Sequence, residues 1–207
     1  MDTTQDTLQI VGYGSLLLKE SAQLSVPGLT EFRLVRVPNY IRIFNKVGIV
    51  FHTRRPIAPN DVRRASCATR RREGAEIMCT TFKCPKSQFP ELFEREHRFR
   101  WIDVEFEESD GGVGSGIMCT EWTDEAYRAT RIKDEADYHD RVGRHYQGKL
   151  WRDDILPFPE YLQLCLDAAQ SHSEALVEHF LQSSFLADGE TTLKQYLQSH
   201  PNALTNS

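Results

Sequence analysis

The 207-residue sequence predicts an α+β fold, with strands in the first two thirds of the chain and helices in the last third. Short runs of β-branched and aromatic residues recur up to residue 122, which is typical of strands. From residue 159 onward, apolar residues recur instead at helical spacing. The strands come in uneven clusters before the helices, which fits α+β better than regularly alternating βαβ units.

The expected strands follow one another along the first part of the chain. The earliest, residues 8–11, stops abruptly at two glycines, and residues 76–83 and 101–106 alternate between two faces. A turn region at residues 110–116 holds four glycines. The expected strands are residues 8–11, 32–37, 40–44, 47–52, 76–83, 101–106 and 116–122.

The expected helices are marked by caps and by apolar spacing. Pro85 and Lys86 lead to Ser87 as an N-cap, which predicts a helix through residues 89–96. Moderately polar connections then extend to Asp154. Three helices end the chain, at residues 159–170, 173–184 and 191–198, and Pro201 closes the last of them.

Length and composition set the class of protein. Hydrophobic residues make up 40% of the chain, which is enough for a sizeable core, and we expect a single domain over residues 1–207 with a helical part from about residue 157. No apolar stretch approaches the roughly 20 residues that span a bilayer. The first six residues are acidic and polar, unlike a signal peptide, so we expect a cytoplasmic protein.

The five cysteines are scattered, and their number is odd. They do not form two pairs at zinc-ligand spacing, and no histidine pair accompanies them. We therefore expect free and mostly buried thiols rather than a metal site or a disulfide framework. The cysteines are Cys67, Cys79, Cys84, Cys119 and Cys165.

An arginine-rich segment, residues 54–72, opposes the net charge of −5. It holds seven arginines, together with Pro56 and Pro59, and so is expected to be a loop. It could contact phosphate or RNA. However, no aromatic residue within it offers base stacking, so a solvated loop, or one that pairs with acidic groups, is favoured.

The strongest indication of chemistry is the sequence Gly12-Tyr13-Gly14-Ser15-Leu16 directly after the first strand. Glycines at such a place let the backbone approach a ligand with its N–H groups exposed. A plain glycine turn is the alternative. A serine hydrolase is disfavoured, because a nucleophile elbow needs a second glycine two residues after the serine.

A cluster of charged residues ends the helix at residues 89–96. Glu94, Glu96 and His97 lie there among arginines. A carboxylate at a helix end before a strand can point into a cleft, where burial would raise its pKa and suit it to proton transfer. A solvated, salt-bridged helix end is the alternative, and His97 is the weaker candidate for a base.

Four motifs, in this order along the chain, resemble those of the γ-glutamylcyclotransferase family, which includes the glutathione-degrading ChaC-type enzymes. They extend over residues 8 to about 185. They are Gly12-Tyr13-Gly14-Ser15-Leu16, Asn39-Tyr40-Ile41-Arg42-Ile43-Phe44, Leu92-Phe93-Glu94-Arg95-Glu96 and Pro157-Phe158-Pro159-Glu160-Tyr161.

The resemblance implies a small, mostly antiparallel β-barrel with flanking helices and a pocket at one mouth. It implies that the α-amine of a γ-glutamyl group attacks its own γ-carbonyl and releases 5-oxoproline without any cofactor. Glu96 matches the family's catalytic glutamate. The segment from Gly12 through Tyr13, Gly14 and Ser15 to Leu16 matches the substrate-binding loop, and Arg42 and Tyr161 are further candidate pocket residues.

The chain also departs from the family pattern. His97, Arg98 and Phe99 follow Glu96 where the family often has a glycine, and the arginine-rich segment replaces a shorter hairpin. The leaving group is therefore open: glutathione, a γ-glutamyl amino acid and a γ-glutamyl amine all fit. A small-molecule substrate is the expected partner rather than a membrane or nucleic acid, and a homodimer is left open. Two alternatives are an inactive binding protein on the same fold and an arginine-loop phosphate- or RNA-binding module.

Overall fold

The computed structural model describes residues 6–54 and 56–205. Residues 1–5, used above to argue against a signal peptide, and Arg55 of the arginine-rich segment lie outside this description. The strands are β1 (Thr7–Gly12), β2 (Thr30–Val47), β3 (Arg63–Pro85), β4 (Arg100–Glu107), β5 (Val113–Thr120), β6 (Leu156–Pro157) and β7 (Ser184–Leu186). The helices are η1 (Ser15–Leu17), α1 (Lys19–Gln23), α2 (Ile49–Arg54), α3 (Phe89–Arg95), α4 (Asp124–Arg131), α5 (Glu135–Tyr138), η2 (His139–Gly143), α6 (Pro159–Gln170), α7 (Glu174–Ser183) and α8 (Leu193–Ser199).

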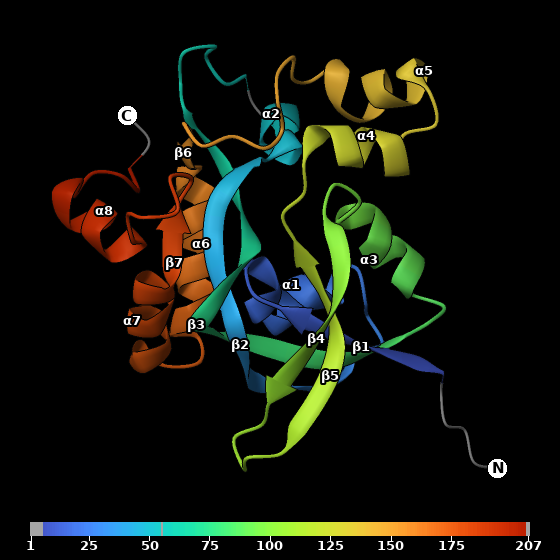
Figure 1. Ribbon diagram of the computed structural model, residues 1–207, viewed down its shortest axis with the longest axis vertical. Coiled ribbons are helices and arrows are strands. Elements are labelled where there is room, and N and C mark those ends of the chain that lie inside the picture. The colour runs from blue at the N-terminus through green and yellow to red at the C-terminus, as the bar shows by residue number, and fades with distance from the viewer. Residues whose placement is uncertain (1–5, 55, 206–207) are drawn as a thin grey trace.

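The strands close into a barrel at the centre of the molecule (Figure 1). Their order is β3–β1–β5–β4–β2, and a direct pairing of β2 with β3 completes the ring. Only the β1–β5 pairing within this ring is parallel. The short strands β6 and β7 extend β3 and β2 in parallel. The predicted α+β fold with a mostly antiparallel barrel is confirmed.

Two strands are much longer than the sequence indicated. The predicted strands at residues 32–37 and 40–44 are one strand, β2, which stays continuous because Asn39 takes a positive φ of 62° and shifts the register there. The second half of the arginine-rich segment, predicted as a loop, belongs to β3, where residues 65–71 pair with β2. The loop prediction was therefore wrong from Arg63 onward.

Two further predictions need correction. Residues 47–52 do not form a strand, because β2 ends at Val47 and α2 begins at Ile49. The connection up to Asp154 is not irregular throughout, because it contains α4, whose N-cap Thr123 accepts a hydrogen bond from the N–H of Ala126. The first of the predicted helices is α3, but its N-cap is Gln88 rather than Ser87.

The three C-terminal helices agree with the prediction. Helix α6 has the predicted bounds, and α7 and α8 begin at capping residues Ser173 and Thr192, whose side chains accept backbone N–H bonds. In Figure 1 these helices lie together beside β2 and β3, with α3 on the opposite side of the barrel.

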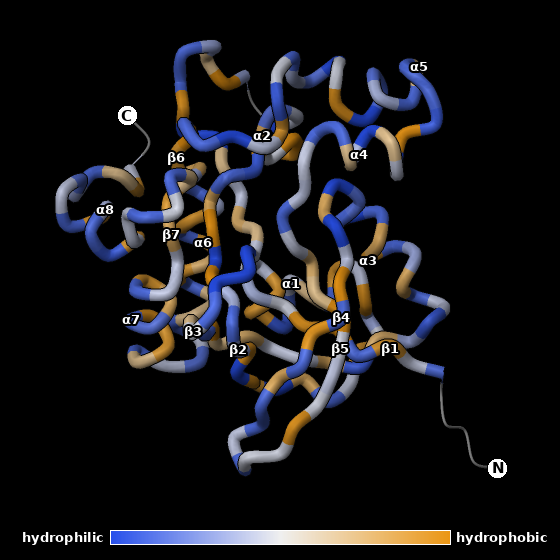
Figure 2. The backbone as a smooth tube through the Cα atoms, viewed as in Figure 1, coloured by the Kyte–Doolittle hydropathy of each residue, from blue (hydrophilic) through white to orange (hydrophobic). Residues whose placement is uncertain are grey.

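Two apolar clusters hold these parts together. The larger fills the barrel and the space under α6 and α7, and includes Phe44, Ile77 and Phe180. The smaller joins β1 and α1 to α3 through Ile10 and Leu92. Figure 2 shows this pattern, with hydrophobic segments along the central strands and α6 and a mostly hydrophilic α5. Among the described residues, no helix is both long and apolar enough to cross a membrane.

Candidate active site

A cavity of about 580 Å³ opens at one end of the barrel. The loop after β1, the end of β2, the start of β3 and the end of β5 meet there. Helix α2, the C-terminal end of α3 and Tyr161 of α6 complete its wall. Segments from β1 to α6 thus meet at this cavity, and of the predicted loop residues Tyr13, Gly14, Ser15 and Leu16 line it while Gly12 does not.

The loop after β1 is folded by its own hydrogen bonds. Gly12 is the last residue of β1 and pairs with Thr80 of β3. The chain then turns into η1, where the N–H of Leu17 donates to the carbonyl of Gly14 over 2.9 Å. The hydroxyl of Thr80 donates to the carbonyl of Leu16 over 2.8 Å. Ser15 and Leu16 are the first residues of this turn, whose N–H groups have no acceptor within it.

Both glycines of the loop are required by close packing. Neither takes a positive φ, so conformational freedom is not the reason. A Cβ on Gly12 would lie 2.5 Å from the Cβ of Leu16, and a Cβ on Gly14 would lie 2.8 Å from the hydroxyl oxygen of Tyr161. Ordinary contacts are 3.4 Å or more. The absence of a side chain at Gly12 therefore lets the loop fold back on Leu16, and its absence at Gly14 lets the loop approach Tyr161 of α6.

Arg42 lies behind the loop rather than on the cavity wall. Its side chain is fully buried, and its Nε donates to the carbonyl of Tyr13 over 2.7 Å. It also donates to the carbonyl of Met78 and to the hydroxyl of Ser183, and its guanidinium stacks on the ring of Phe180. Arg42 therefore fixes the position of the loop, while Tyr13, Gly14, Ser15, Leu16 and Tyr161 line the cavity.

Glu96 stands at the end of α3, on the cavity wall. Its N–H donates to the carbonyl of Leu92 over 3.0 Å, and its side chain is 16% exposed. Burial raises the pKa of the Glu96 carboxyl above its ordinary value, while the positive charges of Arg95, Lys46 and Arg98 partly oppose this. A raised pKa makes a carboxyl better suited to take up a proton from a substrate.

Arg95 fastens the end of α3 to the loop. Its Nε lies 3.2 Å from a carboxylate oxygen of Glu96. Its other nitrogens donate to the hydroxyl of Ser15 over 3.1 Å and to the carbonyl of Ser21 over 2.7 Å. One guanidinium therefore contacts both the candidate proton acceptor and the candidate binding loop.

Lys46 is a residue of the site that the sequence analysis missed. It lies on the cavity wall near the end of β2, is 5% exposed, and places its ammonium 4.5 Å from the centre of the Phe99 ring. It makes no ion pair within 4 Å among the residues the structure describes. Burial and the charge of Arg98 lower the pKa of Lys46 to about 7, against the attraction of Glu96. Its one sequence signal is a lysine at the end of an apolar strand.

The other charged candidates lie at the edge of the site or outside it. The carboxylate of Glu94 is 61% exposed and pairs with Arg141 over 2.5 Å. His97 is buried outside the cavity, with its Nδ1 3.3 Å from the hydroxyl oxygen of Tyr127. Glu96 is therefore the carboxylate of this cluster that is enclosed in the cavity.

All five cysteines are buried and free, as predicted. Cys67 and Cys119 lie on the cavity wall, and burial raises the pKa of both thiols well above the ordinary value. Protonated thiols are poor nucleophiles. Within the part of the chain that the structure describes, no three His, Cys, Asp or Glu side chains gather in a way that could hold a metal ion.

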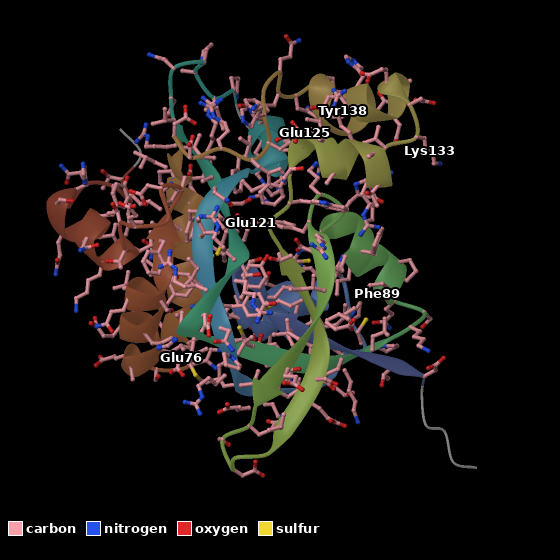
Figure 3. The ribbon with its side chains drawn as sticks, viewed as in Figure 1. Glu76, Phe89, Glu121, Glu125, Lys133 and Tyr138 are labelled. Carbon is pink, nitrogen blue, oxygen red and sulfur yellow. The ribbon has the colours of Figure 1, made fainter. Side chains whose placement is uncertain are left out.

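Several guanidinium groups of the arginine-rich segment bind to the protein itself. Arg70 donates to both carboxylate oxygens of Glu121, which is labelled beside β2 in Figure 3. Arg64 donates to carbonyls of the preceding loop, and Arg72 to the carbonyl of Gly189. The pairing of Arg70 with Glu121 agrees with the interpretation that this segment pairs with acidic groups. Arg54, by contrast, is exposed at the mouth of the cavity.

Comparisons with known proteins agree with this architecture. A γ-glutamyl cyclotransferase structure superposes with a TM-score of 0.56 at 15% identity, covering 84% of this chain and 85% of the other. An uncharacterized protein from Homo sapiens gives the same TM-score, identity and coverage. A γ-glutamyl cyclotransferase specific to glutathione from yeast gives a TM-score of 0.51 at 14% identity, covering 84% of this chain and 95% of the other.

These similarities define the fold. The chain has a γ-glutamylcyclotransferase-like fold, as the four motifs indicated. No protein-family model matches the sequence, and no curated protein matches it. Fold alone does not determine activity, so the function has to be argued from the site.

Proposed function

We propose that this protein is a γ-glutamylcyclotransferase that converts a γ-glutamyl compound into 5-oxoproline and a free amine. The observation that carries the proposal is the buried carboxyl of Glu96 in the cavity that the loop from Tyr13 to Leu16 lines. The fold shared with two γ-glutamyl cyclotransferases supports it.

The γ-glutamyl head is proposed to bind between the loop and Glu96. Main-chain N–H groups of the loop can donate to the oxygen of the γ-carbonyl, on which negative charge develops during attack. The substrate's α-ammonium then faces Glu96. The hydroxyl of Tyr161 lies close to Gly14 and limits the space available to the γ-glutamyl head of the substrate.

The reaction needs one proton acceptor and no external nucleophile. Ionised Glu96 takes a proton from the α-ammonium, and the free amine attacks the γ-carbonyl to form a five-membered ring. The ring nitrogen then loses its second proton to water, the C–N bond to the leaving group breaks, and Glu96 returns its proton to the leaving nitrogen. The amine and the carbonyl belong to one substrate molecule. Binding the substrate with these two groups close together therefore removes much of the entropic part of the activation barrier. The positive charges of Arg95 and Lys46 lower the pKa of Glu96 against the effect of burial and so favour its ionised form.

The test compares two glutamates that lie two residues apart. The purified protein is incubated with glutathione, γ-glutamyl amino acids and γ-glutamyl amines, and 5-oxoproline is measured by mass spectrometry. Glu96→Gln keeps the shape but cannot cycle a proton, so its kcat should fall by about 10²–10⁴ while substrate still binds. Glu94→Gln is the matched control and should change kcat little, because that carboxylate is exposed at the edge of the site.

The same assay decides between this proposal and an inactive binding protein on the same fold. Absence of 5-oxoproline with every compound, together with measurable binding, would favour the binding protein. Unchanged kcat in Glu96→Gln would refute the assigned role of Glu96.

A further inference from the structure

The mouth of the cavity carries apolar side chains that face water. Leu24 is 76% exposed, Val50 48% and Leu164 38%. They come from three separate elements, the end of α1, α2 and α6, and all three line the same cavity. Among the described residues only two other large apolar side chains, Val62 and Val113, are comparably exposed. Of the five exposed large apolar residues in the described part of the chain, three thus surround one opening.

The interior of the cavity also contains a cluster of charged groups. Glu96, Lys46, Arg95 and Arg98 provide charged groups on its wall, and three of them influence the pKa of the fourth, Glu96. The charged γ-glutamyl head matches this end. The substituent on the amide nitrogen must leave the polar end and extend toward the mouth. A cavity of about 580 Å³ falls in the range that holds a drug-sized molecule, and so has room for more than the head.

We propose that the leaving part of the γ-glutamyl substrate carries a bulky apolar side chain, which packs on Leu24, Val50 and Leu164 at the mouth of the cavity. This inference rests on the proposed function and defines its substrate class as γ-glutamyl amides of large apolar or aromatic amino acids and amines. Burial of such a side chain removes apolar surface of both the ligand and these three residues from water, which favours binding.

The experiment uses two compounds that differ only in the apolar group, γ-glutamyl-phenylalanine and γ-glutamyl-alanine. We expect the wild-type protein to show a kcat/KM for the phenylalanine compound about tenfold or more above that for the alanine compound. The double variant Leu24→Asn/Leu164→Asn should lose most of this ratio, with little change for the alanine compound. These residues are exposed, so the fold should survive both changes.

The matched control is Val113→Asn, which changes a 72% exposed valine in the β4–β5 hairpin, outside the residues that line the cavity. It should leave the ratio unchanged. A wild-type ratio near one, or a ratio that the double variant retains, would overturn the proposal. A change of oligomeric state in the double variant without a change of ratio would also overturn it, because the apolar residues would then serve contact with a second copy.

A binding measurement separates this proposal from the proposed function. The dissociation constants of both compounds are measured by calorimetry with Glu96→Gln and with the same protein carrying the two further changes. If no 5-oxoproline forms from either compound, the cyclotransferase assignment fails. The ratio of the two dissociation constants still tests whether the apolar residues at the mouth bind the apolar side chain. Equal dissociation constants for the two compounds, or no binding of the phenylalanine compound, would refute the proposed role of the apolar residues.

Discussion

The contact between Gly14 and Tyr161 predicts a specific coupling between two residues of the site. In Gly14→Ala the new Cβ would lie 2.8 Å from the hydroxyl oxygen of Tyr161. The Tyr161 ring cannot turn away freely, because it packs against the rings of Phe51 and Phe44, with ring centres 5.5 and 6.3 Å apart. Overpacking of this kind costs about 1–3 kcal/mol.

Removal of the hydroxyl should relieve that cost. In a Tyr161→Phe background the nearest atoms to the new Cβ would be Cβ of Cys67 at 3.8 Å and the ring Cζ at 3.9 Å, both ordinary contacts. Gly14→Ala should then cost no more than about 0.5 kcal/mol, which gives a coupling energy of about 1–2 kcal/mol.

The assay is a double-mutant cycle. Unfolding free energies of the wild type, both single variants and the double variant are measured by urea denaturation, and kcat/KM for 5-oxoproline release is measured in parallel. Gly14→Ala should also lower kcat/KM, because it displaces either the loop or Tyr161. An equal cost of Gly14→Ala in both backgrounds would refute the packing argument for this glycine.

The remaining predictions concern Lys46, Ser15 and the thiols. Between pH 7 and 10.5 the unfolded chain holds a proton on Lys46 that the folded protein has lost, so Lys46 makes the free energy of unfolding rise with pH in this range. Lys46→Met should therefore stabilise the protein at pH 6, by an amount that shrinks above pH 7. A difference in unfolding free energy that does not change with pH in urea titrations would contradict this. Ser15→Ala should keep most of its activity, because only the hydrogen bond from Arg95 to the Ser15 hydroxyl, worth about 0.5–1.5 kcal/mol, is lost. Covalent labelling of Ser15 by a fluorophosphonate in the wild type would contradict the cyclotransferase proposal. Cys84→Ser should lower Tm but not kcat, and EDTA should have no effect; activity restored by zinc after EDTA treatment would overturn the metal-free mechanism.

Features set by local sequence were predictable. The first strand ends at a glycine, and α6 and α7 follow directly from apolar spacing and an N-cap. The continuity of β2 through Asn39 was not predictable, because a left-handed residue usually ends a strand, and here the register shift lets it continue. The apolar residues after Gly48 suit a strand as well as a helix, and only α2 in the structure decides between them.

The site was predictable where a motif carried it and not where burial did. Glu96 and the loop belong to recognisable local patterns. Lys46 acquires its properties from groups about fifty residues away, Phe99 and Arg98, which the folding of β2 against the end of α3 brings to it. In the sequence, little distinguishes Lys46 from the other lysines and arginines. Arg42 shows the reverse case, because its motif is recognisable but its side chain points behind the loop.

The adjacency of Arg95 and Glu96 has a consequence for how the site can move. Arg95 ties the loop and α1 to the last turn of α3, and Glu96 is the next residue along the chain. The spacing between Glu96, the proposed proton acceptor, and the proposed binding loop is therefore maintained by one peptide bond and one guanidinium, rather than by the docking of separate elements. A tilt of α3 would carry both together, so sequence changes on its outer face can alter the walls of the cavity while the reacting groups keep their alignment.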